Sequence, residues 1–301
     1  MIVDCLVVKR EGEIEAAQLT GHELVELEHD PRVIAVAPVM AVRDLAAGAP
    51  PIGADGVWDA RADARAGAGV TLAVVGDAPL PPLGSDTTII RRPVLDGHQP
   101  ATTAQLAEAL VDAARLGAQV ALVTIACDVP TTIAGLLARG YAPPAAMATA
   151  VAHLLANARA LAAVIASRAE MIVVAPVGDD SRRGLDHPGG PALVPATMIA
   201  RLPRVFGVGA VTAHRAGLIV APTSNLFPTL VAPGGDGAGP CATAVAAAQV
   251  AAIAVRWWRA TARGAIADEV RAQMIAAATT GAFAASPDPA DVGAGLAQPP
   301  R

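Results

Sequence analysis

The chain has 301 residues, of which 53% are hydrophobic and 16% are charged, so it can bury a large core, and we expect one main domain with a small appendage. A net charge of −5 and a total of only three Phe, three Trp and one Tyr exclude nucleic acid as an expected partner. The start lacks a basic segment followed by an apolar run, and the three cysteines are widely spaced. We therefore expect a cytoplasmic protein without a secretory signal or a disulfide framework.

The first 48 residues predict a small unit that a linker joins to the remainder. Residues 2–9 alternate as a strand, residues 21–28 form a short helix, and residues 33–39 form a second strand. This β-α-β unit is too small to be stable alone. A stretch rich in Pro, Gly and Ala at residues 45–56 follows as the linker. The predicted division is 1–48 and 49–301.

From residue 70 onward, buried strands alternate with helices, which predicts an α/β fold with a parallel sheet. The predicted strands are 70–75, 88–95, 120–125, 171–175, 205–211, 218–221 and 229–232, and the predicted helices are 103–116, 145–168 and the segment after Cys241. Ligands bind beyond the carboxyl ends of parallel strands. Residues 76–77, 124–128 and 178–180 should therefore meet the start of the last helix.

Cys241 stands where this last helix begins. Its apolar run from residue 242 to 255 is interrupted by Thr243 and Gln249 and ended by Arg256, so we expect a buried central helix and no membrane partner. A helix N-terminus offers unpaired N–H groups and the positive end of a dipole, which favour a thiolate over a thiol. The alternative is a small polarizable side chain that only fills space.

The sequence Gly-x-Cys-Ala-x-Ala at residues 239–244 resembles the nucleophile motif of the subtilisin-like peptidases (subtilases), with Cys241 in place of the serine. Residues 23–36 resemble the end of the family's inhibitory prodomain, and residues 117–127 resemble the strand that lines its substrate cleft. Further segments that resemble the family are 171–179, 195–196, 205–211, 224–225, 231–234 and 292–296. The resemblance implies a three-layer subtilase-like fold with a mainly parallel central sheet and a shortened α+β prodomain remnant.

The sequence departs from the family pattern at the positions of the catalytic residues. Gly76 stands in the slot of the catalytic aspartate, and Asp77 comes one residue later, which turns its side chain to the other face. The histidine motif is not found, and Gly178 replaces the oxyanion asparagine, a donor worth roughly 3 kcal/mol where it has been removed. Acyl transfer needs a nucleophile, a base and an orienter within hydrogen-bond reach.

His98 is the candidate substitute base for Cys241, and Asp77 is the candidate orienter. Their plainer interpretations are a solvated turn histidine and a loop cap. The loop at residues 179–187 contains acidic residues but follows no calcium-loop pattern, so we expect a charged surface loop, no metal and no cofactor. The expected binding residues are Thr124, Ile125, Ala126, Cys127, Gly178, Asp179 and Asn225.

Two functions stay open. The first is a pseudoprotease that binds a peptide or a partner protein in the former cleft by strand addition, as an accessory protein. Such a protein keeps its residues 1–45 attached, and we expect them to occupy the cleft. The alternative is an enzyme that uses Cys241 for acyl transfer, hydrolysis or cyclisation of a peptide-like substrate. A third class is a structural subunit that binds through Trp257 and Trp258.

Overall fold

The N-terminal unit is a three-stranded antiparallel sheet with one helix. In the computed structural model, which describes residues 2–50, 52, 69–83, 87–94, 101–183, 192–235, 241–261 and 266–300, its strands run in the order β2-β1-β3. These elements are β1 Ile2–Lys9, β2 Ile14–Thr20, α1 Gly21–His29 and β3 Val33–Pro38. The prediction of a β-α-β unit is therefore wrong in one respect, because it missed the edge strand β2. Most of its side chains are exposed, so its sequence lacks the expected alternation.

The central sheet has seven strands and is mainly parallel, as predicted. Its order is β11-β10-β9-β7-β5-β6, with β12 also paired to β10. Only β11 runs antiparallel to its neighbour among these strands. The strands are β5 Thr71–Val75, β6 Thr88–Arg92, β7 Val120–Val123, β9 Ile172–Pro176, β10 Val205–His214, β11 Gly217–Val220 and β12 Leu230–Pro233.

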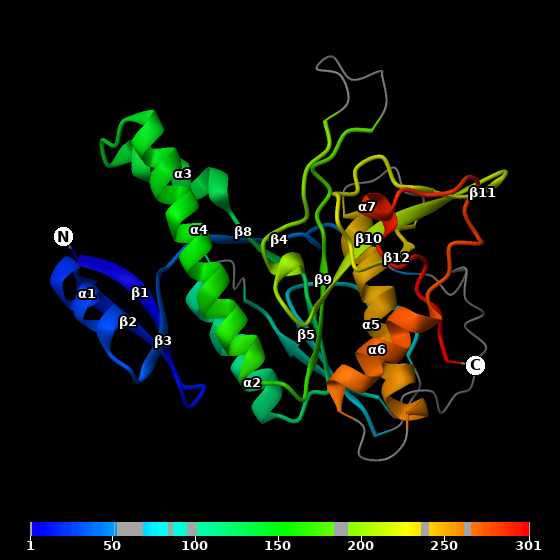
Figure 1. Ribbon diagram of the computed structural model, residues 1–301, viewed down its shortest axis with the longest axis horizontal. Helices are drawn as coiled ribbons and strands as arrows, with labels where there is room; N and C mark the ends of the chain where they lie inside the picture. The colour runs from blue at the N-terminus through cyan, green and yellow to red at the C-terminus, as the bar shows by residue number, and fades with distance from the viewer. Residues whose placement is uncertain are drawn as a thin grey trace.

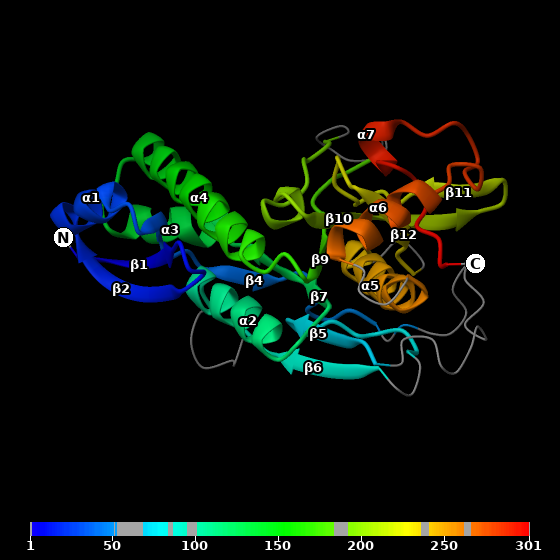
Figure 2. The ribbon, with the colours of Figure 1, turned by 60° about the horizontal axis from the view of Figure 1, so that its bottom comes forward.

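Helices cover both faces of this sheet, which gives the three layers (Figures 1 and 2). One face packs against α2 Thr103–Arg115 and α4 Pro143–Ala166, and the other packs against α5 Ala242–Ala260 and α6 Ala267–Ala277. Residues of β5 alternate between the two cores: Ala73 and Val75 belong to the first, Leu72 and Val74 to the second. Every residue of α5 from Ala242 to Val255 is buried, as expected for a central helix.

The predicted strand 120–125 is interrupted at Thr124. β7 ends before it, and a separate strand, β8 Ile125–Cys127, leaves the central sheet and pairs antiparallel with β4 Val42–Asp44. Neither β4 nor α3 Val129–Ala138 was predicted as an element. The remaining elements that the sequence did not predict are α6, η1 Ile199–Arg201 and α7 Pro289–Val292.

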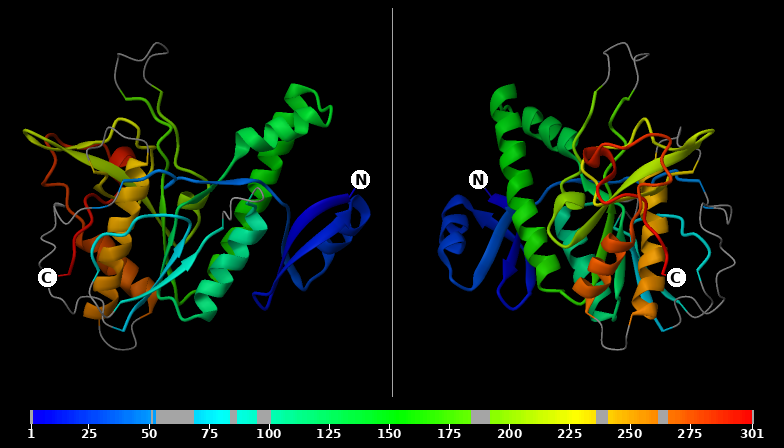
Figure 3. Two further views of the ribbon diagram at one scale, coloured as in Figure 1. Left: turned by 180° about the vertical axis from the view of Figure 1, so that it is seen from behind. Right: turned by 45° about the vertical axis from the view of Figure 1, so that its right-hand side comes forward.

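Helix α4 lies between the N-terminal unit and the central sheet (Figures 1 and 3). The Asn157 side chain on α4 donates to the Pro38 carbonyl oxygen at 2.7 Å, and Arg168, just beyond the helix, donates to the Gly12 carbonyl oxygen at 3.0 Å. Among the described residues, α4 is the one helix long and apolar enough to cross a membrane by length and composition. In this fold, buried side chains of α4 such as Leu161 and Val164 contribute to the core of the sheet.

Candidate functional site

A segment that follows the N-terminal unit crosses the carboxyl ends of β5 and β7 above the start of α5. We call residues 41–49 the covering segment. Its strand β4 pairs with β8 on one side, and on the other side the Val42 N–H donates to the Ala101 carbonyl oxygen at 2.9 Å. Beyond β4, the Leu45 N–H donates to the Thr124 carbonyl oxygen at 2.8 Å. Backbone hydrogen bonds on both sides therefore hold β4 in an extended conformation, whereas residues 45–48 form a turn in which the Ala49 N–H donates to the Ala46 carbonyl oxygen at 2.8 Å.

Cys241 lies beneath this covering segment. Its Sγ is 3.3 Å from the Ala47 carbonyl oxygen, to which the thiol donates, and the residue is only 8% exposed. Its φ of 77° lies in the left-handed region, which costs a residue with a Cβ roughly 1–2 kcal/mol. The cysteine thus occupies the N-cap position of α5, where its side chain forms no cap hydrogen bond.

The surroundings of Cys241 favour the thiol over the thiolate. Burial raises the pKa of the Cys241 thiol above its usual 9.0, and the negative charges of Asp179 and Asp44 raise it further. The sequence-based expectation of a thiolate considered only the helix N-terminus. That expectation is wrong for this arrangement, because desolvation and the two carboxylates act in the opposite direction.

Asp179 caps α5 in place of Cys241. Its carboxylate accepts the Thr243 backbone N–H at 3.2 Å, the Thr243 hydroxyl at 2.8 Å and the Thr223 hydroxyl at 3.2 Å. Burial raises the pKa of Asp179, and the hydrogen bonds from Thr243 partly counteract that rise. Sequence analysis placed Asp179 among the ligand-binding residues. In the structure its oxygens serve the helix and its neighbouring loop.

Asp44 is a site residue that the sequence analysis did not identify. Its Oδ2 accepts the Asp77 backbone N–H at 2.6 Å, and its Oδ1 accepts the Ala46 backbone N–H at 2.8 Å. The side chain of Asp77 itself is exposed, whereas the adjacent Gly76 is buried. The candidate orienter therefore contributes its backbone to this site. No local sequence signal marks Asp44, because its position depends on the pairing of β4 with β8.

Gly178 has no room for a side chain. Its φ is +100°, and a Cβ at this position would lie 2.6 Å from the Asn225 Nδ2. Asn225 is 1% exposed; its amide oxygen accepts the Asp180 and Ser181 N–H groups, and its Nδ2 donates to the Val177 carbonyl oxygen. Asn225 was predicted to bind a ligand. Its amide instead holds the loop after β9 in place.

Residues 124–127, which were predicted to line the cleft, run beside the covering segment. Ala126 is opposite Arg43, and Ile125 is opposite Asp44, in the antiparallel register of β4 and β8. Cys127 is opposite Val42, and burial raises the pKa of its thiol to about 12. Thr124 is fully buried, and its hydroxyl has no hydrogen-bond partner among the described residues.

Several predicted residues lie outside the described part of the chain. These are His98, Asp186 and His187, together with Gly239 and Pro240 of the motif. Within the described ranges, no three His, Cys, Asp or Glu side chains come close enough to hold a metal ion. The candidate anchors Trp257 and Trp258 are both half-buried, and the Trp257 indole N–H donates to the Gln298 carbonyl oxygen at 2.7 Å.

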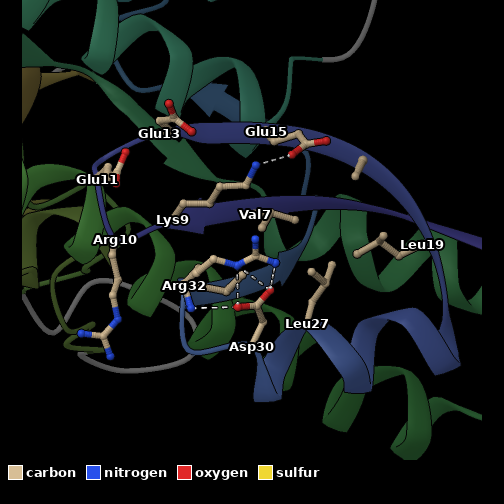
Figure 4. A pocket seen from close by; sticks show the side chains of 12 residues that line it. Val7, Lys9, Arg10, Glu11, Glu13, Glu15, Leu19, Leu27, Asp30 and Arg32 are labelled. Carbon is tan, nitrogen blue, oxygen red and sulfur yellow. Dashed lines mark hydrogen bonds and ion pairs between the residues drawn. The ribbon is translucent and has the colours of Figure 1, made fainter.

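A cavity of about 530 Å³ lies in the N-terminal unit, away from Cys241 (Figure 4). Its base is apolar, with Val7, Leu19 and Leu27, and charged side chains surround it. Lys9 pairs with Glu15 at 3.0 Å, and Arg32 pairs with Asp30 at 2.7 Å. The pair with Arg32 lowers the pKa of Asp30 to about 2. These four charges neutralise each other locally.

No family model and no curated protein matches this sequence. Among solved structures, fervidolysin from Fervidobacterium pennivorans, a keratinolytic enzyme related to subtilisin, is similar with a TM-score of 0.59 at 12% identity. The match covers 99% of this chain and 60% of that chain, less than two thirds of its length. The epidermin leader peptide processing serine protease EpiP from Staphylococcus aureus is similar with a TM-score of 0.54 at 12% identity, over 97% of this chain and 91% of that one. The chain therefore has the fold of the subtilisin-like proteases.

Proposed function

We propose that this protein is a subtilase-fold pseudoprotease that holds an extended peptide along β8 without cutting it. The covering segment is the observation that carries the proposal. It adds a strand to β8 and continues over Cys241. Strand addition gives affinity through backbone hydrogen bonds, which a peptide of another protein can form equally well. In the described part of the chain, β8 has β4 as its single strand partner.

The chemistry around Cys241 supports binding over cleavage. Burial, and then the carboxylates of Asp179 and Asp44, raise the pKa of the thiol, whereas a nucleophile needs a lowered pKa or an adjacent base. Gly76 and Gly178 leave no space for side chains at the positions that correspond to the family's aspartate and oxyanion asparagine. Together with the histidine motif that the sequence lacks, three of the four catalytic functions have no side chain in the family positions.

The solved structures support the peptide-binding half of the proposal. EpiP is named for processing a leader peptide, and fervidolysin for degrading keratin, so both act on polypeptide. We infer that this chain keeps the peptide-binding edge of the fold and serves as an accessory protein. A cytoplasmic location, where its free cysteines stay reduced, is part of the proposal.

The test is the integrity of the covering segment. The full-length protein and its Cys241→Ala variant are incubated side by side near neutral pH, and their intact masses are followed by mass spectrometry. We expect both to stay uncut between residues 41 and 49. A synthetic peptide with the sequence of residues 41–48 should also be recovered intact. Cleavage in the wild type that the Cys241→Ala variant lacks would contradict the pseudoprotease.

One observation favours the alternative, an enzyme with a cysteine nucleophile. The Cys241 Sγ lies against a peptide carbonyl, that of Ala47, at 3.3 Å. An enzyme of this kind would form a thioester with the chain up to residue 47 and release a new amino terminus at residue 48. The mass experiment separates the two functions, because a trapped thioester or a cut at this bond appears only in the enzyme.

A further inference from the structure

The carboxylate of Asp44 fills the space that a side chain at position 76 would take. A Cβ built on Gly76 would lie 2.9 Å from the Asp44 Oδ2 and 2.2 Å from the Thr124 Oγ1. The φ of Gly76 is +119°, which further disfavours any L side chain. The end of β5 therefore accommodates a carboxylate from the covering segment where other residue types at position 76 would exclude it.

The groups around this carboxylate are hydrogen-bond donors. The Asp77 N–H donates to one oxygen at 2.6 Å, and the Ala46 N–H of the segment itself donates to the other at 2.8 Å. The hydroxyl of Thr124 crowds the same point beside Gly76, is fully buried and has no hydrogen-bond partner in the described structure. The Asp44 carboxylate does not accept this hydroxyl, so its donors are the two backbone N–H groups.

We propose that Gly76 and the Asp77 N–H form a binding site for the side-chain carboxylate of an aspartate in a bound peptide. This inference rests on the proposed function and names its peptide class: extended peptides with aspartate opposite Ile125. Asp44 is the tethered occupant of the same site. Glutamate is one methylene too long for the space beside Gly76, and the amide group of asparagine places a donor against one of the two N–H donors.

The test uses the full-length Asp44→Ala variant, in which the site loses its own occupant. Binding of a labelled peptide with the sequence of residues 41–48 is measured by fluorescence anisotropy, together with versions that carry Asn, Glu or Ala in place of the aspartate. We expect the aspartate peptide to bind at least about tenfold more tightly than each of the others, as the loss of a charged hydrogen bond implies. Alkylation of Cys241, corrected for the thiol pKa measured in each protein, should be faster in this variant than in the wild type, because its covering segment is held less firmly.

The outcomes separate this site from the proposed function. Equal binding of all four peptides overturns the carboxylate site but leaves peptide binding intact. Faster alkylation of Cys241 in the Asp44→Ala variant without binding of any peptide overturns the proposed function, and the site with it. An unchanged alkylation rate also overturns the site, because the carboxylate then contributes nothing to holding the covering segment.

Discussion

The carboxylate of Asp179 lies 2.8 Å from the hydroxyl of Thr243, the second residue of α5, and accepts the backbone N–H of the same residue. This pair ties the end of β9 to the start of the central helix. Helix N-termini prefer a carboxylate, both for its hydrogen bonds and for the helix dipole. Asp179 therefore performs the capping that Cys241 does not.

Replacing this cap should lower stability. We expect Asp179→Ala to reduce the free energy of unfolding by about 2 kcal/mol, because it removes a helix cap and leaves the Thr243 N–H without its acceptor. Urea denaturation followed by circular dichroism measures the change. The control is Asp77→Ala, an exposed aspartate at the same sheet edge, which should stay within about 0.5 kcal/mol of the wild type. Equal losses in the two variants would refute the capping role.

The Cys241 thiol should titrate above its usual pKa of 9.0, because burial and two carboxylates oppose the thiolate. The ultraviolet absorbance of the thiolate, taken as the difference between wild type and Cys241→Ala, reports this pKa. We expect Asp44→Asn to lower it, since one of the opposing charges is removed, and Asp77→Asn to leave it nearly unchanged. A pKa below 9.0 in the wild type would favour an activated nucleophile instead.

Cys127 should make the protein sensitive to alkaline pH. Burial raises its pKa from 9.0 to about 12, so the folded state holds this proton more tightly than the unfolded state does. The resulting stability is complete below pH 9.0 and is lost as the pH rises from there toward about 12, by at most about 1.4 kcal/mol per pH unit. Urea unfolding at a series of pH values should show a steeper decline for the wild type than for Cys127→Ala. Parallel curves would contradict the raised pKa.

The strands that the sequence predicted best are those buried on both faces. Residues 72–75 and 172–176 are continuous apolar runs, because helices cover them from two sides. β2 was missed because it is a mostly exposed edge strand, and β4 was missed because it exists only through its pairing with the distant β8. α3 contains Pro130 and Gly135, which weaken its helical signal, although Asp128 caps it at 3.0 Å from the Thr131 N–H.

Strand topology was the only part of the sequence analysis that predicted which residues lie close together in the site. The rule that ligands meet the carboxyl ends of parallel strands placed Thr124, Asp179 and Cys241 close together, and the structure has them there. The rule says nothing of which carboxylates face the sulfur. The pKa of the Cys241 thiol depends on Asp44, which belongs to a distant part of the chain, and on burial, which depends on the three-dimensional packing.

Placing an asparagine at position 178 should damage the protein rather than activate it. A Cβ on Gly178 would lie 2.6 Å from the Asn225 Nδ2 at a φ of +100°, so Gly178→Asn must displace a buried amide that holds the loop after β9. We expect a loss of about 2–4 kcal/mol in the free energy of unfolding. The matched control is Gly235→Asn, at a φ of +76° with no atom within 4 Å of its Cβ, which should cost about 1 kcal/mol or less. Urea denaturation of both variants measures the difference. Equal costs in the two variants would mean that the loop adjusts to a side chain at position 178. A Cys241-dependent cut in the covering segment of Gly178→Asn would show that catalysis lacked only a single oxyanion donor.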